Sequence, residues 1–192
     1  MRFGVLTGLY VGVVVMAQVG TNKIVDVPLT GLTAPGGTFL IGIALSMIEI
    51  AHRTAPSRRE GFVNAQVMVA CGWAASVILA GYLAILNVMS PDDPLFDRLA
   101  GTWRIVAASL LAFAVSETID NSLGTWMRDR VHDTWRVVGT NAVSVPLDSI
   151  VFLLVAFGSL EFISGQIVVK YAATLLVGVP LVLLLRRHVR PR

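Results

Sequence analysis

The sequence predicts an all-α integral membrane protein with six transmembrane helices and both termini in the cytoplasm. The chain is 55% hydrophobic and only 14% charged, whereas a soluble domain has roughly 45–50% apolar and about 25% charged residues. Its mean hydropathy is +0.75. The charged residues gather in short segments between apolar runs, and about 20 apolar residues are needed to cross the hydrocarbon core of a bilayer. Composition and pattern therefore both indicate a multi-pass membrane protein.

Each long apolar run is expected to be a helix, because unpaired backbone groups are costly in lipid. The alternating pattern of a membrane β-barrel is absent. The first run resembles a signal peptide, but further apolar runs follow it, so we expect a retained span. No hydrophilic linker divides the chain, which predicts a single domain over residues 1–192. The expected spans, placed to within a few residues, are 3–21, 34–50, 62–88, 103–123, 137–157 and 166–185.

The basic residues of the loops are distributed unequally between the two sides of the predicted bundle. One side carries only Lys23, Arg98 and Arg104. Cytoplasmic loops are rich in Lys and Arg, so the richer side, with both termini, is expected to be cytoplasmic. The net charge of +3 follows from this distribution, and we expect no nucleic-acid partner. The basic residues of the richer side are Arg2, Arg53, Arg58, Arg59, Arg128, Arg130, Arg136, Arg186, Arg187, Arg190 and Arg192.

Polar and ionisable residues within the spans are the candidates for function. An ionised side chain at the bilayer centre costs about 2.5–3.5 kcal/mol on insertion scales, so a simple scaffold has little reason to carry several. Asp148 is the strongest candidate, because it lies deep in a span and an apolar run without a local partner follows it. The predicted substrate-binding residues are Asp148, Lys170, Glu117, Asp120, Asn141, Ser144, Glu49, Asn22 and Gln66.

Helical spacing brings some of these candidates onto common faces. Glu117 and Asp120 are one turn apart, as are Ser144 and Asp148. Lys170 enters from the opposite side of the membrane, a few residues into the last span. The second, fourth, fifth and sixth spans are therefore expected to enclose a polar cavity.

Other interpretations of these residues stay open. Glu49 and Asp120 lie close enough to the cytoplasmic headgroups to snorkel and pair with basic loops. The segment Pro35-Gly36-Gly37 and Pro146 indicate either irregular backbone that lines a cavity or ordinary kinks and close helix contacts. Trp73, Phe113 and Tyr171 are candidates for a buried aromatic wall, with helix packing as the alternative role.

The sequence contains no catalytic signature. A phosphate-binding Gly-rich loop, HExxH, GxSxG and paired cysteines are all missing. The single cysteine, Cys71, lies within an apolar run, so neither a disulfide framework nor a thiolate metal cluster is expected. We expect a protein that is not an enzyme and uses no cofactor or metal. A small intramembrane enzyme with Glu117 and Asp120 as acid and base is a minor alternative.

Several segments together resemble the queuosine-precursor transporter family, also called the vitamin uptake transporter (VUT) family. They are Asn22 at the end of the first span, Glu49 followed by Arg53, the run RIVAASLLAFAVSETID, the S-x-x-x-D-S-I-V-F segment that starts at Ser144, and Lys170 ten residues before Pro180. The resemblance covers nearly all of the chain. Four positions depart from the family pattern: Glu49 replaces an Asp, Glu117 replaces a Gln, and Val145 and Pro146 lie where polar residues are common.

The resemblance implies a multi-pass importer in the inner (plasma) membrane that carries a deazaguanine-type base used to make queuosine. A guanine-like edge offers adjacent N–H donors to a carboxylate and a carbonyl oxygen to a lysine or an amide. The expected partners are such a purine-like base and the lipid bilayer, with a homodimer left open. The alternative within transport is a substrate-binding subunit of a multi-component vitamin or base importer.

Overall fold

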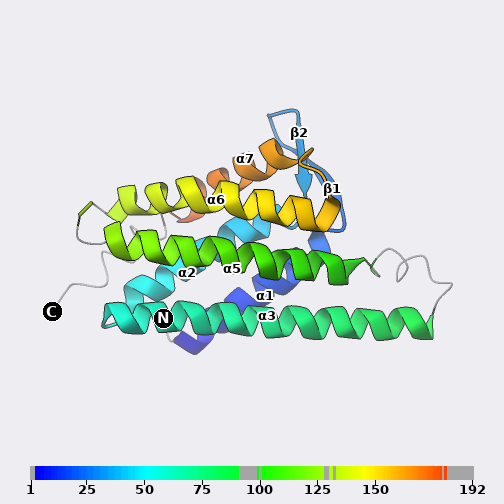
Figure 1. The fold of residues 1–192 in the computed structure, drawn as a ribbon, viewed down its shortest axis with the longest axis horizontal. Coiled ribbons are helices and arrows are strands. Elements are labelled where there is room, and N and C mark those ends of the chain that lie inside the picture. The colour runs from blue at the N-terminus through cyan, green and yellow to red at the C-terminus, as the bar shows by residue number, and fades with distance from the viewer. Residues whose placement is uncertain are drawn as a thin grey trace.

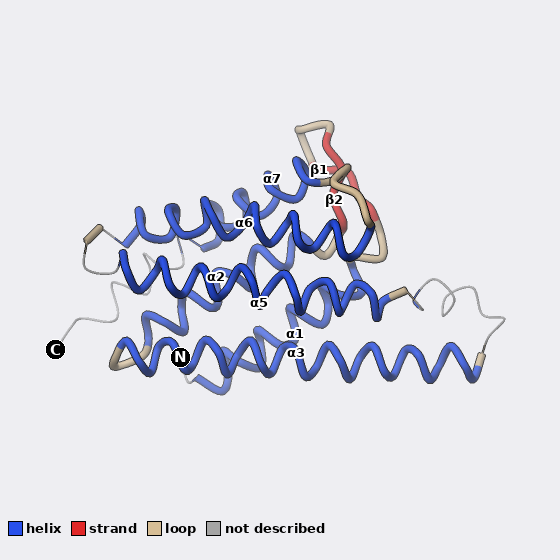
Figure 2. The backbone as a smooth tube through the Cα atoms, viewed as in Figure 1, coloured by secondary structure: helices blue, strands red, loops and turns tan. Residues whose placement is uncertain are grey.

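A computed structural model shows a bundle of helices with a small β-hairpin at one end (Figures 1 and 2). It describes residues 3–90, 99, 101–127, 130–131, 133–178 and 180. The described elements are α1 (Phe3–Gly20), β1 (Ile24–Val27), β2 (Leu32–Pro35), α2 (Thr38–Thr54), α3 (Arg58–Met89), α5 (Thr102–Met127), α6 (Asp133–Phe157), α7 (Ile163–Ala173) and the π-helical turn η1 (Thr174–Gly178).

All six predicted spans contain a helix, which confirms the predicted all-α membrane fold. Within the described part of the chain, three helices are long and apolar enough to cross a bilayer, namely Phe3–Gly20, Arg59–Met89 and Val138–Phe157. Shorter apolar helices cover Thr38–Ile48, Thr102–Ser116 and Ile163–Val177. The predicted end of the last span, beyond residue 180, lies outside the described residues.

Consecutive helices run in alternating directions along the bundle (Figure 1). The hairpin lies at the end where α6 stops and α7 starts, next to the end of α1. Lys23 and Arg104 lie at this same end, where the sequence places few basic residues. This arrangement agrees with the alternation of the predicted spans.

The β-hairpin was not predicted, and residues 34 and 35 belong to it and not to the second span. The strands β1 and β2 are antiparallel, with Ile24 opposite Pro35 and Val27 opposite Leu32. Leu29 and Gly31 have φ angles of 66° and 67°, the left-handed conformation typical of tight turns. The helix α2 then begins at Thr38.

Close backbone contacts fix the hairpin against the helices. A Cβ atom on Gly165, near the start of α7, would lie 2.0 Å from the carbonyl oxygen of Thr33 in β2. A Cβ atom on Gly37 would lie 2.1 Å from the carbonyl oxygen of Ala17 in α1. Only glycine permits such approaches. Of the two readings of Pro35-Gly36-Gly37, the structure supports close packing for the glycines.

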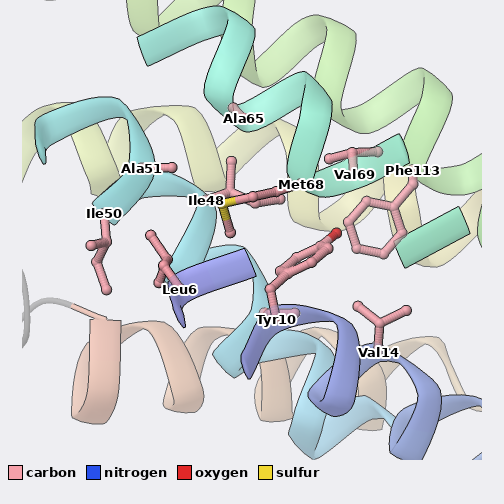
Figure 3. Packing of buried hydrophobic residues seen from close by; sticks show 11 residues of the cluster. Leu6, Tyr10, Val14, Ile48, Ile50, Ala51, Ala65, Met68, Val69 and Phe113 are labelled. Carbon is pink, nitrogen blue, oxygen red and sulfur yellow. The ribbon is translucent and has the colours of Figure 1, made fainter. Parts of the chain in front are cut away.

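Two apolar clusters hold the helices together. One surrounds Tyr10 of α1, which lies beside Met68 of α3 and Phe113 of α5 (Figure 3). The other joins α5 and α6 through residues such as Ala108 and Leu153, both fully buried. Large apolar side chains also cover the outside of α3, as expected for a surface in contact with lipid acyl chains.

We predict that Gly165→Ala lowers the melting temperature of the purified protein. The added methyl group collides with the Thr33 carbonyl, and overpacking of this kind typically costs about 1–3 kcal/mol. The matched control is Gly81→Ala in the middle of α3, where nothing lies within 4 Å of the added Cβ atom. Thermal unfolding in detergent compares the two variants. Equal melting temperatures would contradict the tight packing of β2 on α7.

Candidate functional site

A small cavity lies between five helices in the half of the bundle nearest the hairpin. Its volume is about 20 Å³, which is room for about one water molecule. Most of the lining side chains are polar, although the surroundings are apolar. The lining residues are Ala17 and Gln18 of α1, Thr21 just after it, Thr38 and Ile41 of α2, Ser109 and Phe113 of α5, Asp148 and Phe152 of α6, and Gln166 and Lys170 of α7.

A buried ion pair forms one wall of this cavity. The Nζ atom of Lys170 lies 2.5 Å from Oδ2 of Asp148. The two residues are only 2% and 4% exposed. An isolated charge is very costly in such surroundings, but a hydrogen-bonded pair of opposite charge is tolerated. Asp148 and Lys170 therefore compensate each other's charge at this depth.

Neighbouring side chains complete the hydrogen bonding of the pair. Besides Asp148, the Lys170 ammonium donates to Oγ of Ser149 at 2.9 Å and to Oε1 of Gln166 at 3.1 Å. The other carboxylate oxygen, Oδ1 of Asp148, accepts from Oγ of Ser116 at 3.4 Å. All three donors of the ammonium group are thus used. The pair is part of a satisfied polar network between α5, α6 and α7.

Helical geometry explains how these groups meet. Gln166 and Lys170 are one turn apart on α7, so both face α6. Asp148 and Ser149 are adjacent on α6, and both are buried. Because α6 and α7 run in opposite directions (Figure 1), the lysine reaches both residues from across the helix contact.

Gln18 of α1 forms the opposite polar wall. Its Oε1 atom accepts from Oγ of Ser109 at 3.3 Å, and its Nε2 atom donates to Oγ of Ser76 at 3.5 Å. Gln18 is 2% exposed. The amide thus connects α1 with α5 and α3 behind the cavity. Phe113 and Phe152 supply the aromatic part of the lining.

The predicted site residues divide into those at or near the cavity, those elsewhere in the structure, and those whose side chains lie outside the described residues. Asp148 and Lys170 are brought together at the cavity, and Ser144 is buried one turn from Asp148 on α6. Asn141 is half-buried, and its backbone carbonyl accepts a hydrogen bond from the Tyr171 hydroxyl at 3.3 Å.

Other predicted residues lie elsewhere. Asn22 is exposed at the end of α1, where its side chain donates to Thr102. Gln66 is half-buried on α3 and is not among the residues that line the cavity. The side chains of Glu49, Glu117 and Asp120 lie outside the described residues.

Several cavity residues were missed by the sequence prediction. The first helix, which was not expected to line the cavity, contributes Gln18. Gln166 carried a usable signal, because it lies one turn before Lys170 on the same helix face. Ser109 and Ser116 are two turns apart, a spacing that also indicates one common face of α5. Arg104 lies in the first turn of α5, on the side of the bundle with few basic residues. Its Nε atom donates to the Val155 carbonyl at the end of α6 and so caps that helix.

We predict strong coupling between Asp148 and Lys170 in a double-mutant cycle. Asp148→Asn leaves a buried ammonium group without its counter-charge, and breaking such a pair typically costs about 3–5 kcal/mol. The double variant Asp148→Asn/Lys170→Met should lose less stability than the sum of the losses in the two single variants. Thermal unfolding of the empty protein measures each variant. The exposed Asp26→Asn serves as the control. Strictly additive effects would contradict the coupling.

Comparison with known proteins assigns the chain to a transporter family. The model of the family described as putative vitamin uptake transporter matches residues 35–185. Neither the curated proteins nor the solved structures contain a match. The matched region includes α2, α3, α5, α6, α7 and the whole Asp148–Lys170 pair. The chain therefore belongs to the vitamin uptake transporter family.

Proposed function

We propose that this chain imports a guanine-like queuosine precursor, a deazaguanine-type base, and that the base binds at the Asp148–Lys170 pair. The single observation that carries the proposal is the burial of this carboxylate and this ammonium together in a polar cavity inside an apolar bundle. The family match supports the coarser function of an uptake transporter. The identity of the base follows from the hydrogen-bonding groups that the side chains of the site offer.

The pair offers complementary groups to a guanine-like edge. A carboxylate accepts two adjacent N–H donors in a bidentate arrangement, and an ammonium group donates to a carbonyl oxygen. In the empty protein these groups satisfy each other. A base that provides both the donors and the acceptor replaces the contact between Asp148 and Lys170 without leaving either charge unpaired. Gln18 and Gln166 add amide groups for the other ring atoms.

The aromatic residues suit a flat ligand. Phe113 and Phe152 lie on α5 and α6 and line the same cavity. Aromatic rings stack on the flat face of any nucleobase. In nucleic-acid binding proteins this stacking stabilises binding by about 1–3 kcal/mol per base. Stacking on the face of the ring would come from α5 and α6, and polar recognition at its edge from α6 and α7.

The cavity must open before it can admit a base. A volume of about 20 Å³ is sufficient for little more than one water molecule. We therefore interpret the structure as a closed state of the transporter. In the proposed cycle, the helices that line the cavity separate at one end and then at the other, which exposes the site to each side of the membrane in turn. The proposed direction is import across an inner (plasma) membrane, which rests on the match to a family of uptake transporters.

We predict that a deazaguanine-type base raises the melting temperature of the wild-type protein in detergent, because a ligand that binds only the folded state stabilises it by mass action. At a concentration of 100 times Kd the stabilisation is about 2.7 kcal/mol. Pyrimidine bases, which lack the bicyclic edge, should produce no shift at the same concentration. Equal shifts with pyrimidines, or no shift with any deazaguanine, would overturn the assignment of the substrate.

We predict that Asp148→Asn reduces uptake of the base to the background of empty liposomes, because the amide presents an NH2 donor in place of one of the two carboxylate oxygens that accept the adjacent N–H donors. The purified chain is reconstituted alone, so that uptake by the wild type also excludes a requirement for a separate energising complex. Asp26→Asn, on the exposed face of β1, is the matched control and should transport normally. Normal uptake by Asp148→Asn would refute the proposed site. Binding without uptake in the wild type would instead favour a substrate-binding subunit.

A further inference from the structure

A proline inside α6 leaves one backbone carbonyl without its usual partner. Pro146 lies within the helix Asp133–Phe157. Proline has no N–H group, so the carbonyl of Ala142, four residues earlier, loses its intrahelical hydrogen bond. In lipid an unpaired backbone carbonyl is costly, and prolines are tolerated in membrane helices because neighbouring groups satisfy the freed carbonyl.

Tyr171 of α7 supplies this missing hydrogen bond. Its hydroxyl oxygen lies 3.4 Å from the carbonyl oxygen of Ala142 and 3.3 Å from that of Asn141, so the hydroxyl group donates to this pair of carbonyls. Tyr171 follows Lys170 directly in the sequence. Tyr171, which hydrogen-bonds the carbonyl left free by Pro146, is therefore adjacent to Lys170, the cation of the site.

The two neighbours attach α7 to α6 at two levels. Lys170 binds Asp148 and Ser149, and Tyr171 binds α6 almost two turns earlier. One attachment alone restrains α7 against α6 at a single level. Two attachments at different heights fix both its rotation and its depth.

The helical geometry of α7 changes shortly after Lys170 and Tyr171. The α-helix ends at Ala173, and the π-helical turn Thr174–Gly178 follows. The N–H group of Thr174 donates to the carbonyls of Lys170 and Tyr171, four and three residues earlier. Such π-helical turns are rare and less regular than the α-helix. Contacts to α6 therefore set the position of Lys170 together with the close packing of α2 and β2 on α7.

We infer that Tyr171 is a positioning residue of the site, which holds Lys170 opposite Asp148 by anchoring α7 on the carbonyls next to Pro146. Its importance for transport rests on the proposed function, in which Lys170 and Asp148 bind the base. The competing explanation is a purely structural one, in which Tyr171 only satisfies the carbonyl that Pro146 leaves free.

Pro146→Ala separates these two explanations. It restores an N–H group within α6, so the Ala142 carbonyl no longer needs Tyr171. A purely structural role of Tyr171 then disappears in this background. A positioning role persists, because the restored hydrogen bond lies within α6 and does nothing to hold α7.

The chain offers a direct measure of the position of Lys170. Its lysines are Lys23, which is exposed, and Lys170, which is 2% exposed. Acetic anhydride modifies accessible amines, and mass spectrometry reports the modification of Lys170 relative to Lys23 within the same molecule. The measurement uses the full-length protein without ligand, so it is valid even if the proposed substrate is wrong.

Tyr171→Phe is expected to raise the relative modification of Lys170 about fivefold, the effect of one neutral hydrogen bond on an opening equilibrium, and to lower the melting temperature by about 2–4 °C. Pro146→Ala alone should leave the modification unchanged. In the double variant the melting temperature should recover while the modification of Lys170 stays high. The control is Tyr82→Phe on the outside of α3, where the tyrosine is 58% exposed.

Two results would overturn the inference. Unchanged modification of Lys170 in Tyr171→Phe would show that the hydroxyl does not hold the lysine. Recovery of both quantities in the double variant would show that Tyr171 only satisfies the free carbonyl. If Tyr171→Phe alone does not fold, comparison of the double variant with Pro146→Ala gives the same answer. Affinity for a deazaguanine base, measured in these variants, should fall wherever the modification of Lys170 rises. A wild type that binds no such base would reject the proposed substrate and leave the result of the modification experiment valid.

Discussion

The ion pair between Asp148 and Lys170 is the interaction on which the rest of this structure depends. Neither charge is tolerated alone in an apolar bundle, so α6 and α7 must meet at one particular depth with these two side chains in contact. The network around the pair restricts the arrangement further. Ser116 brings α5 to the carboxylate, while Ser149 and Gln166 occupy the remaining donors of the ammonium group. Three helices are therefore fixed by one local requirement for charge compensation.

The hairpin extends this constraint to the first two helices. It connects the end of α1 with the start of α2, and its second strand packs on the first turn of α7 through Gly165. Gly37 brings the start of α2 against α1 at the same end of the bundle. These backbone contacts place Gln18 and Thr38 around the cavity that Gln166 and Lys170 also line. The polar side chains of the site thus lie on backbone that is held by packing as well as by hydrogen bonds.

The features that could be predicted from the sequence are those whose alternatives carry a large free-energy cost in lipid. The helices were predictable because long apolar runs have few alternatives in lipid. Asp148 and Lys170 were predictable because ionised groups deep in a span need a reason to be there. Gln18 was not among the predicted substrate-binding residues, because an uncharged amide costs less to insert into a membrane than a charged group and therefore gives a weaker signal. Gln66 has the same side chain as Gln18, but it lies away from the cavity, because the direction that a helix faces is decided by packing against helices distant in sequence.

The hairpin was beyond prediction for a related reason. Its strands are four residues long, and a two-stranded hairpin by itself is at best marginally stable in water. Its stability depends on contacts with α1 and α7, and the contact at Gly165 involves residues far apart in the sequence. Glycines of this kind give the same sequence signal whether they line a cavity or permit close packing. Only the three-dimensional arrangement distinguishes these alternatives.

A site that is closed on itself when empty imposes a condition on its substrate. To enter, a ligand must replace the contact between Asp148 and Lys170, and any ligand that satisfies only one of the two charges leaves the other buried and unpaired. An apolar compound of the right size pays this penalty in full, whereas a base with adjacent N–H donors and a carbonyl oxygen avoids it. In the proposed mechanism, the same pair that stabilises the empty bundle therefore selects the substrate. Selectivity arises from the cost of separating two charges as well as from the shape of the cavity.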